Sequence, residues 1–79
     1  MKGDKNIMNI SELEFAIFCI ENIAKRLNTN AEDVYSAFTI KSNILYGYII
    51  PEYEMLHTQS KEYIVDDILE YMNELGVSV

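Results

Sequence analysis

Apolar residues recur at steps of three and four along two long stretches of this chain, and this spacing constrains the fold more than any other feature. In the first stretch they are Leu13, Ala16, Ile17, Ile20, Ala24 and Leu27. In the second they are Ile64, Ile68, Tyr71, Met72 and Leu75. Such steps place side chains along one face of an α-helix. Each stretch is therefore predicted to form an amphipathic helix that buries this face.

Capping residues mark where the first two helices begin. Ser11 has Glu14 three residues later, and Thr29 has Glu32 three residues later. This is the capping-box spacing, in which two side chains satisfy free backbone N–H groups at the helix start. We therefore expect N-caps at Ser11 and Thr29, with the first helix ending near Asn28. The inward face of the second helix is expected to consist of Val34, Ala37 and Phe38.

The last helix is predicted to run from about residue 61 to residue 75. Either Thr58 or Ser60 could serve as its N-cap, since both have a hydroxyl group that can accept a backbone hydrogen bond. Gly76 suits the left-handed conformation that commonly ends a helix.

Residues 44–50 are ambiguous because they are rich in aromatic and β-branched side chains, which favour strands. A single strand would have no partner to pair with, so we predict a short buried helix instead. Pro51 cannot donate a backbone hydrogen bond and should break this segment. A second short turn is expected over residues 52–56.

The fold class that follows is all-α: a small bundle of three to four helices whose third segment is broken near Pro51. A chain of 79 residues has room for one domain with one core. We place this domain at residues 10–76, after a flexible N-terminal tail at residues 1–9. Residues 77–79 are expected to be a frayed C-terminal end.

The charge of the chain argues against some classes of partner. The net charge is −7, of which residues 42–79 carry −6. Such a surface repels nucleic acid phosphates and anionic lipids, so we expect no nucleic acid partner and a protein partner with a basic surface. No apolar run approaches the roughly 20 residues of a membrane span, so we expect no membrane association. The single Cys19 fits a reducing compartment, and we expect a cytoplasmic protein.

Signatures of enzymes are absent from the sequence. There is no glycine-rich phosphate loop and no nucleophile elbow. One histidine and one cysteine cannot form a His/Cys metal site. We therefore expect neither a metal nor a cofactor, and an enzyme is the less favoured class.

Two surface features are candidates for a protein interface. Phe15 and Phe18 fall away from the apolar stripe of the first helix. Either this helix is central and covered on both sides, or these side chains contact a partner or a second copy of the chain. Glu62, Asp66 and Glu70 are spaced by four on the last helix and form an acidic ridge. The ridge is either a solvated face or a docking surface for basic side chains.

His57, the single histidine, lies in the polar joint before the last helix. In the structural interpretation, which we favour, its ring bonds to the backbone and fixes the joint. In the functional interpretation, it acts with Tyr53 and Asp66 as the centre of a minimal enzyme or small-ligand-binding domain.

Four segments carry a resemblance to a known family: residues 14–15, 18–21, 53–59 and 62–68. Their Leu-His-Thr-Gln and Ile-Val-Asp-Asp blocks are the most specific part. Together they resemble a family of short bacterial proteins, common in gut Firmicutes and Bacteroidetes, catalogued as domain of unknown function 3791. The resemblance extends over roughly residues 11–72.

The resemblance implies that the protein binds a partner protein, and it does not imply a particular reaction. Genes of this family often lie beside a gene for a larger protein with ADP-ribosyltransferase character, which implies an antitoxin-like or accessory subunit. The motif positions that it marks are Tyr53, His57, Thr58, Gln59, Asp66 and Asp67. We therefore expect a small helical protein–protein interaction module, with the domain centred on His57 as the alternative.

Overall fold

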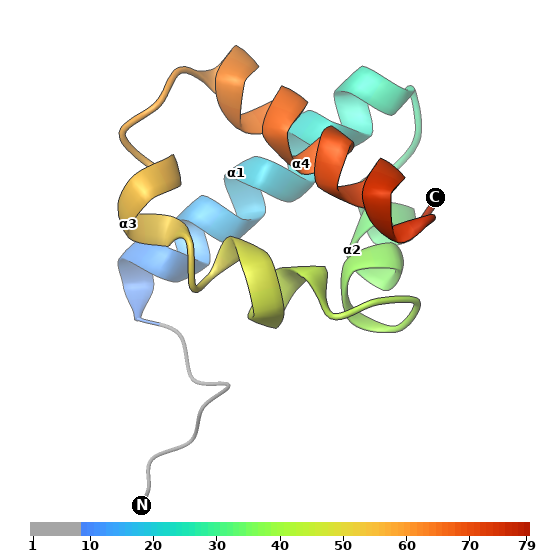
Figure 1. Ribbon diagram of the computed structural model, residues 1–79, viewed down its shortest axis with the longest axis horizontal. Coiled ribbons are helices and arrows are strands. Elements are labelled where there is room, and N and C mark those ends of the chain that lie inside the picture. The colour runs from blue at the N-terminus through green and yellow to red at the C-terminus, as the bar shows by residue number, and fades with distance from the viewer. Residues whose placement is uncertain (1–8) are drawn as a thin grey trace, which may run out of the picture.

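The computed structural model describes residues 9–79 (Figure 1), so the predicted tail at residues 1–9 lies outside it except for Asn9. The chain forms the helical segments α1 (Ile10–Leu27), α2 (Ala31–Thr39), η1 (Leu45–Ile49), α3 (Tyr53–Leu56) and α4 (Lys61–Leu75). No strand occurs among residues 9–79, and the predicted all-α fold is confirmed. The ambiguous segment at residues 44–50 is helical, as predicted.

The N-cap of α1 is Asn9, and the predicted cap at Ser11 is wrong. The Asn9 side chain accepts a hydrogen bond from the Glu12 backbone N–H at 2.7 Å, and the Glu12 carboxylate accepts one from the Asn9 N–H at 3.3 Å. This is a complete capping box, two residues upstream of the predicted one. Asn9 and Glu12 have the required spacing, and asparagine is as good an N-cap as serine.

The N-cap of α2 is likewise an asparagine, Asn30, and not Thr29 as predicted. Its side chain accepts from the Asp33 backbone N–H at 2.8 Å. At α4 the prediction holds, because Ser60 accepts from the backbone N–H three residues later at 3.1 Å. Gly76 ends α4 with φ 72°, the left-handed conformation expected of it.

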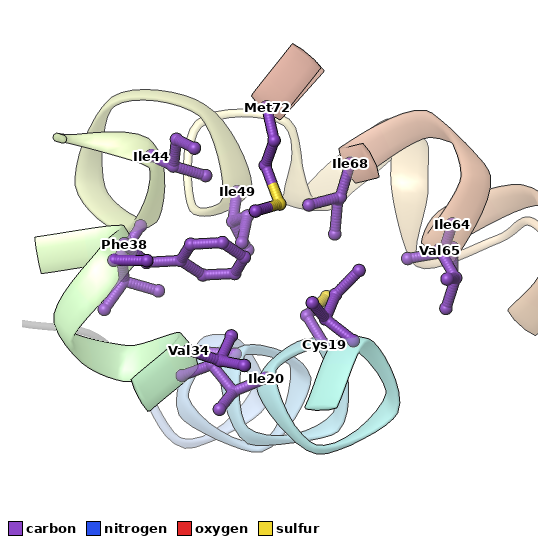
Figure 2. Close-up of a cluster of buried hydrophobic side chains, with 14 of the residues drawn as sticks. Cys19, Ile20, Val34, Phe38, Ile44, Ile49, Ile64, Val65, Ile68 and Met72 are labelled. Carbon is purple, nitrogen blue, oxygen red and sulfur yellow. The ribbon is translucent and has the colours of Figure 1, made fainter. Parts of the chain in front are cut away.

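A single core holds the helices together. Figure 2 shows side chains from α1, α2, η1 and α4 converging on it. The core side chains of α1 and α2 are Phe15, Ala16, Cys19, Ile20, Ile23, Ala24, Val34, Ala37 and Phe38. Those of the other segments are Ile44, Leu45, Ile49, Leu56, Ile64, Val65, Ile68 and Met72.

The buried face of α1 differs from the predicted stripe. Leu13 and Ile17 are 45% and 46% exposed, whereas Phe15 and Ile23, which the stripe omitted, are 8% and 0% exposed. The helix packs against both α2 and α4, and α4 crosses it in Figure 1. Because α2 and α4 both pack against α1, its buried face lies closer to Ile23 than the predicted stripe does. Leu13 and Ile17 consequently lie at the edge of the core and face solvent.

The buried face of α4 was predicted more closely. Ile64, Ile68 and Met72 are buried as expected. Val65 is also buried but was not predicted, whereas Leu75, expected inside, is 48% exposed. Val77 is half-buried against the core, and the frayed end at residues 77–79 stays a prediction.

The η1 segment is a π-helix, in which the Ile50 N–H bonds to the Leu45 carbonyl five residues back at 3.0 Å. In an α-helix, residues five apart point to different sides. The wider π-turn brings them onto nearly the same side, and Ile44 and Ile49 are both buried. Pro51 follows the segment directly, where the predicted break falls.

The capping box gives a direct test of where α1 begins. Asn9→Ala should lower the free energy of unfolding by about 1 kcal/mol, because it removes the side chain that satisfies the Glu12 N–H. Ser11→Ala, the matched control, should leave stability unchanged or slightly raised, because alanine is the better helix former. Urea unfolding followed by circular dichroism measures both, and the opposite order would show that the helix begins at Ser11.

Candidate functional site

Segments that carry the family resemblance converge on one hollow of the surface. This aromatic hollow, of about 320 Å³, lies between the first half of α1, α3 and the α3–α4 connection. Its lining residues are Ser11, Glu14, Phe15, Phe18, Tyr53, His57, Gln59 and Ile64. The fold thus brings together positions about 40 residues apart in the sequence.

Four aromatic rings in contact form one side of this hollow. Phe15 lies 6.3 Å from Phe18 and 5.4 Å from Tyr53 between ring centroids, with the Phe15–Tyr53 pair edge to face at 73°. The His57 ring stacks on Tyr53 at 4.3 Å. The spacings of three along α1 and four along α3 place these neighbours on common faces. The Phe15–Tyr53 contact thereby fastens the short α3 helix to α1.

The orientation of the His57 ring is set by the backbone of α3. Its Nδ1 atom lies 2.7 Å from the Tyr53 carbonyl oxygen. A carbonyl oxygen can only accept, so Nδ1 carries the hydrogen, and in the neutral ring the lone pair is on Nε2. The side chain–backbone bond expected at His57 is therefore present. Because His57 is exposed, its loss would leave no buried group unpaired.

The proposed minimal enzyme of Tyr53, His57 and Asp66 is only partly assembled, because two of its three residues line this hollow. Asp66 does not line it and instead pairs with Arg26, with 2.9 Å between its carboxylate oxygen and the guanidinium nitrogen. Thr58 is exposed and donates a hydrogen bond to the Met55 carbonyl oxygen at 3.0 Å. Within residues 9–79, no three His, Cys, Asp or Glu side chains are grouped to hold a metal ion. The hollow is lined by the His57 ring and the Glu14 carboxylate beside aromatic side chains.

Asp67 connects two segments of the fold. It accepts a hydrogen bond from the Tyr48 hydroxyl at 2.5 Å, which links η1 to α4. Burial raises the pKa of Tyr48 well above its ordinary value, and the bond to the negatively charged Asp67 raises it further. The Tyr48 ring also stacks on Tyr71 at 4.0 Å. These contacts identify Asp67 as a residue that holds the fold together.

Cys19 lies in the core with no exposed surface. Burial raises the pKa of its thiol to about 12, so the thiolate that would be needed for nucleophilic chemistry is not formed at neutral pH. The structure places this residue among the packing side chains of α1.

The acidic ridge lies near positively charged side chains of the neighbouring helix α1. Glu62, Asp66 and Glu70 are exposed along one side of α4, as their spacing predicts. Arg26, from the last turn of α1, pairs with Asp66. Lys25 and Glu62 line a separate, smaller hollow between α1 and α4. An exposed pair such as Arg26–Asp66 contributes about 0.2–1 kcal/mol. Part of the ridge is thus compensated within the fold.

Phe15 is buried and Phe18 is half-buried against the core. Both side chains therefore pack within the fold, and the second apolar patch predicted for this helix is not an open surface. The outward apolar side chains of α1 are instead Ile10, Leu13 and Ile17, the first of them 73% exposed. Sequence periodicity had assigned two of these to the core.

Ile17 also lines a larger hollow, which we call the α1–α2 groove. It has a volume of about 620 Å³ and lies between the middle of α1 and the start of α2. The lining residues are Ile17, Ile20, Glu21, Ala31, Glu32, Asp33, Tyr35 and Ser36. Apolar side chains and three carboxylates meet here without a lysine or arginine among the lining residues. The groove could not be predicted from sequence, because apolar spacing does not show which residues of a stripe a neighbouring helix will bury.

These features define a small all-helical domain whose surface includes the aromatic hollow and the α1–α2 groove. Residues 14–74 match the family described as "Protein of unknown function (DUF3791)", and the chain belongs to this family. Neither a curated protein nor a solved structure matches the chain. Among residues 9–79, no helix is both long and apolar enough to cross a bilayer.

The Tyr48–Asp67 bond predicts a pH-dependent stability. At neutral pH, Tyr48→Phe should lower the free energy of unfolding by about 1 kcal/mol, because the lost bond has a charged acceptor but is partly exposed. The pKa of Tyr48 is higher in the folded chain than in the unfolded one. The contribution is therefore fully present below the ordinary tyrosine pKa of about 10 and is lost as pH rises above it.

Urea unfolding of the parent and the variant at increasing pH measures this effect. The stability difference should shrink above about pH 10. Tyr46→Phe is the control, because the Tyr46 hydroxyl forms no hydrogen bond to residues 9–79. This variant should lose less free energy of unfolding than Tyr48→Phe at neutral pH. A Tyr48→Phe difference that stays constant across this range would contradict the account.

Proposed function

We propose that this protein is a small helical protein–protein interaction module that binds its partner through the α1–α2 groove. The observation that carries the proposal is the apolar surface that the fold leaves uncovered at this groove. Ile17 and Tyr35, on opposite sides of the groove, are 46% and 50% exposed. Exposed apolar side chains on two neighbouring helices are the kind of surface that a protein partner covers.

The apolar surface continues from the groove along α1. Ile10, Leu13 and Ile17 follow one another at steps of three and four, so they form one outward stripe. This is the arrangement of anchors by which a helix packs into a partner. The stripe gives the module a contact longer than the groove alone.

An antitoxin-like or accessory role toward a larger neighbouring protein agrees with this surface. Such a subunit acts by covering a site on its partner, so it needs a rigid docking face and no chemistry of its own. We place the protein in the cytoplasm, where the buried Cys19 stays a thiol. The net charge of −7 favours a basic protein as the partner over a nucleic acid.

The two contacts expected from sequence are supported less. Asp66 of the acidic ridge already forms a salt bridge with Arg26 of the same chain. Phe15 is too deeply buried to reach a partner, and Phe18 is half-buried. The alternative of a small-ligand site rests on the His57 Nε2 lone pair in the aromatic hollow.

The proposal predicts a complex with the product of the adjacent gene. The two purified proteins should elute together in size-exclusion chromatography with light scattering. The double variant Ile17→Ser/Tyr35→Ser should lose the complex, because it replaces the exposed apolar contacts with hydroxyl groups. The melting temperature of the double variant, measured alongside, shows whether it remains folded.

Ile40→Ser is the matched control for this experiment. Ile40 is also an isoleucine and is 80% exposed, but it does not line the groove. The control should bind like the parent. The proposal is wrong if the parent forms no complex, or if the double variant and the control bind equally well.

A further inference from the structure

We infer that the α1–α2 groove receives a basic amphipathic helix of the partner protein. This inference rests on the proposed function and names the chemistry of the partner at the same site. It is argued from the apolar floor of the groove, from the charge at its rim and from the charge of the whole chain.

The apolar residues that line the groove, which we call its floor, would be covered by an apolar strip of a partner helix. Ile17 and Ile20 of α1 and Tyr35 of α2 supply apolar surface between two helices. The outward stripe from Ile10 to Ile17 extends this surface by about 10 Å, at a rise of 1.5 Å per residue. Anchors at steps of three, four and seven on a docked helix would match this length.

The carboxylates that line the groove, which we call its rim, would be paired by basic residues on both sides of that strip. Glu21 of α1 and Glu32 and Asp33 of α2 line the groove, and none of them forms a salt bridge with residues 9–79. The positive end of the α2 dipole partly offsets Glu32 and Asp33, so Glu21 has the greatest need of a cation. Lysine and arginine can lay their apolar stems on the floor while their charged ends reach the rim.

The same charges disfavour a second copy of this chain as the occupant. A two-fold contact at this face would bring both sets of rim carboxylates together. The chains would also repel each other through their net charge of −7 each. A basic helix would avoid both the repulsion between rim carboxylates and the repulsion between two acidic chains.

The probe for a direct test is a synthetic peptide of about 20 residues, longer than the roughly 12–15 residues below which an isolated helix is marginal in water. Leucines form one face, and lysines flank them. A matched peptide with glutamate in place of every lysine tests the charge. Binding to the full chain is measured by fluorescence anisotropy at two salt concentrations, and amide chemical shifts locate the site.

Only the lysine peptide should bind, more weakly at high salt, with shifts at Ile17, Ile20 and Tyr35. Glu21→Gln/Glu32→Gln should weaken binding about three- to tenfold at low salt. Glu74→Gln, an exposed carboxylate outside the groove, should change it little.

The lysine peptide should also compete with the adjacent gene product. The inference is wrong if both peptides bind equally, if the lysine peptide does not bind, or if neutralising the rim has no effect. The proposed function survives these failures if Ile17→Ser/Tyr35→Ser still abolishes the complex with the gene product. Self-association that is lost in that double variant would identify a second copy as the occupant and overturn the inference.

Discussion

The burial of one side of α1 is the constraint on which the rest of the structure depends. Cys19 and Ile23 have no exposed surface, because α2 and α4 both pack against this helix. Within residues 9–79, no segment covers the opposite edge of α1. Ile10, Leu13 and Ile17 therefore remain in solvent, where apolar surface costs free energy unless a partner removes it from water.

The remaining segments complete the core and fix the two surface sites. The π-turn of η1 directs Ile44 and Ile49 inward, and the Tyr48–Asp67 bond ties that turn to α4. The Phe15–Tyr53 contact fastens α3 to α1 and forms the aromatic hollow. The α1–α2 groove is larger and is lined by three carboxylates, whereas the aromatic hollow is lined by one, Glu14. This difference is why we assign partner binding to the groove.

The sequence was sufficient to predict the helical class, the extent of α4 and the helical state of residues 44–50. Capping residues and apolar spacing are local signals, and they carry this information. The exposed edge of α1 could not be predicted, since Leu13 and Ile17 fit the same spacing as Ile20 and the choice depends on where α2 and α4 lie. The Arg26–Asp66 pair joins residues 40 positions apart and is likewise a property of the packing. Of the candidate site, Tyr53 and His57 are brought together, whereas Asp66 is not.

The most direct test of this account compares the same substitution on the two sides of α1. Ile23→Val and Ile17→Val change helix propensity equally, so a difference between them reports burial. Urea unfolding should show a loss of about 0.5–1.5 kcal/mol for Ile23→Val, which leaves a cavity in the core. Ile17→Val should cost at most about 0.5 kcal/mol, as for a surface position. Equal losses, or a greater loss at Ile17, would show that the Leu13–Ile17 edge is the covered side of α1 and would contradict the account.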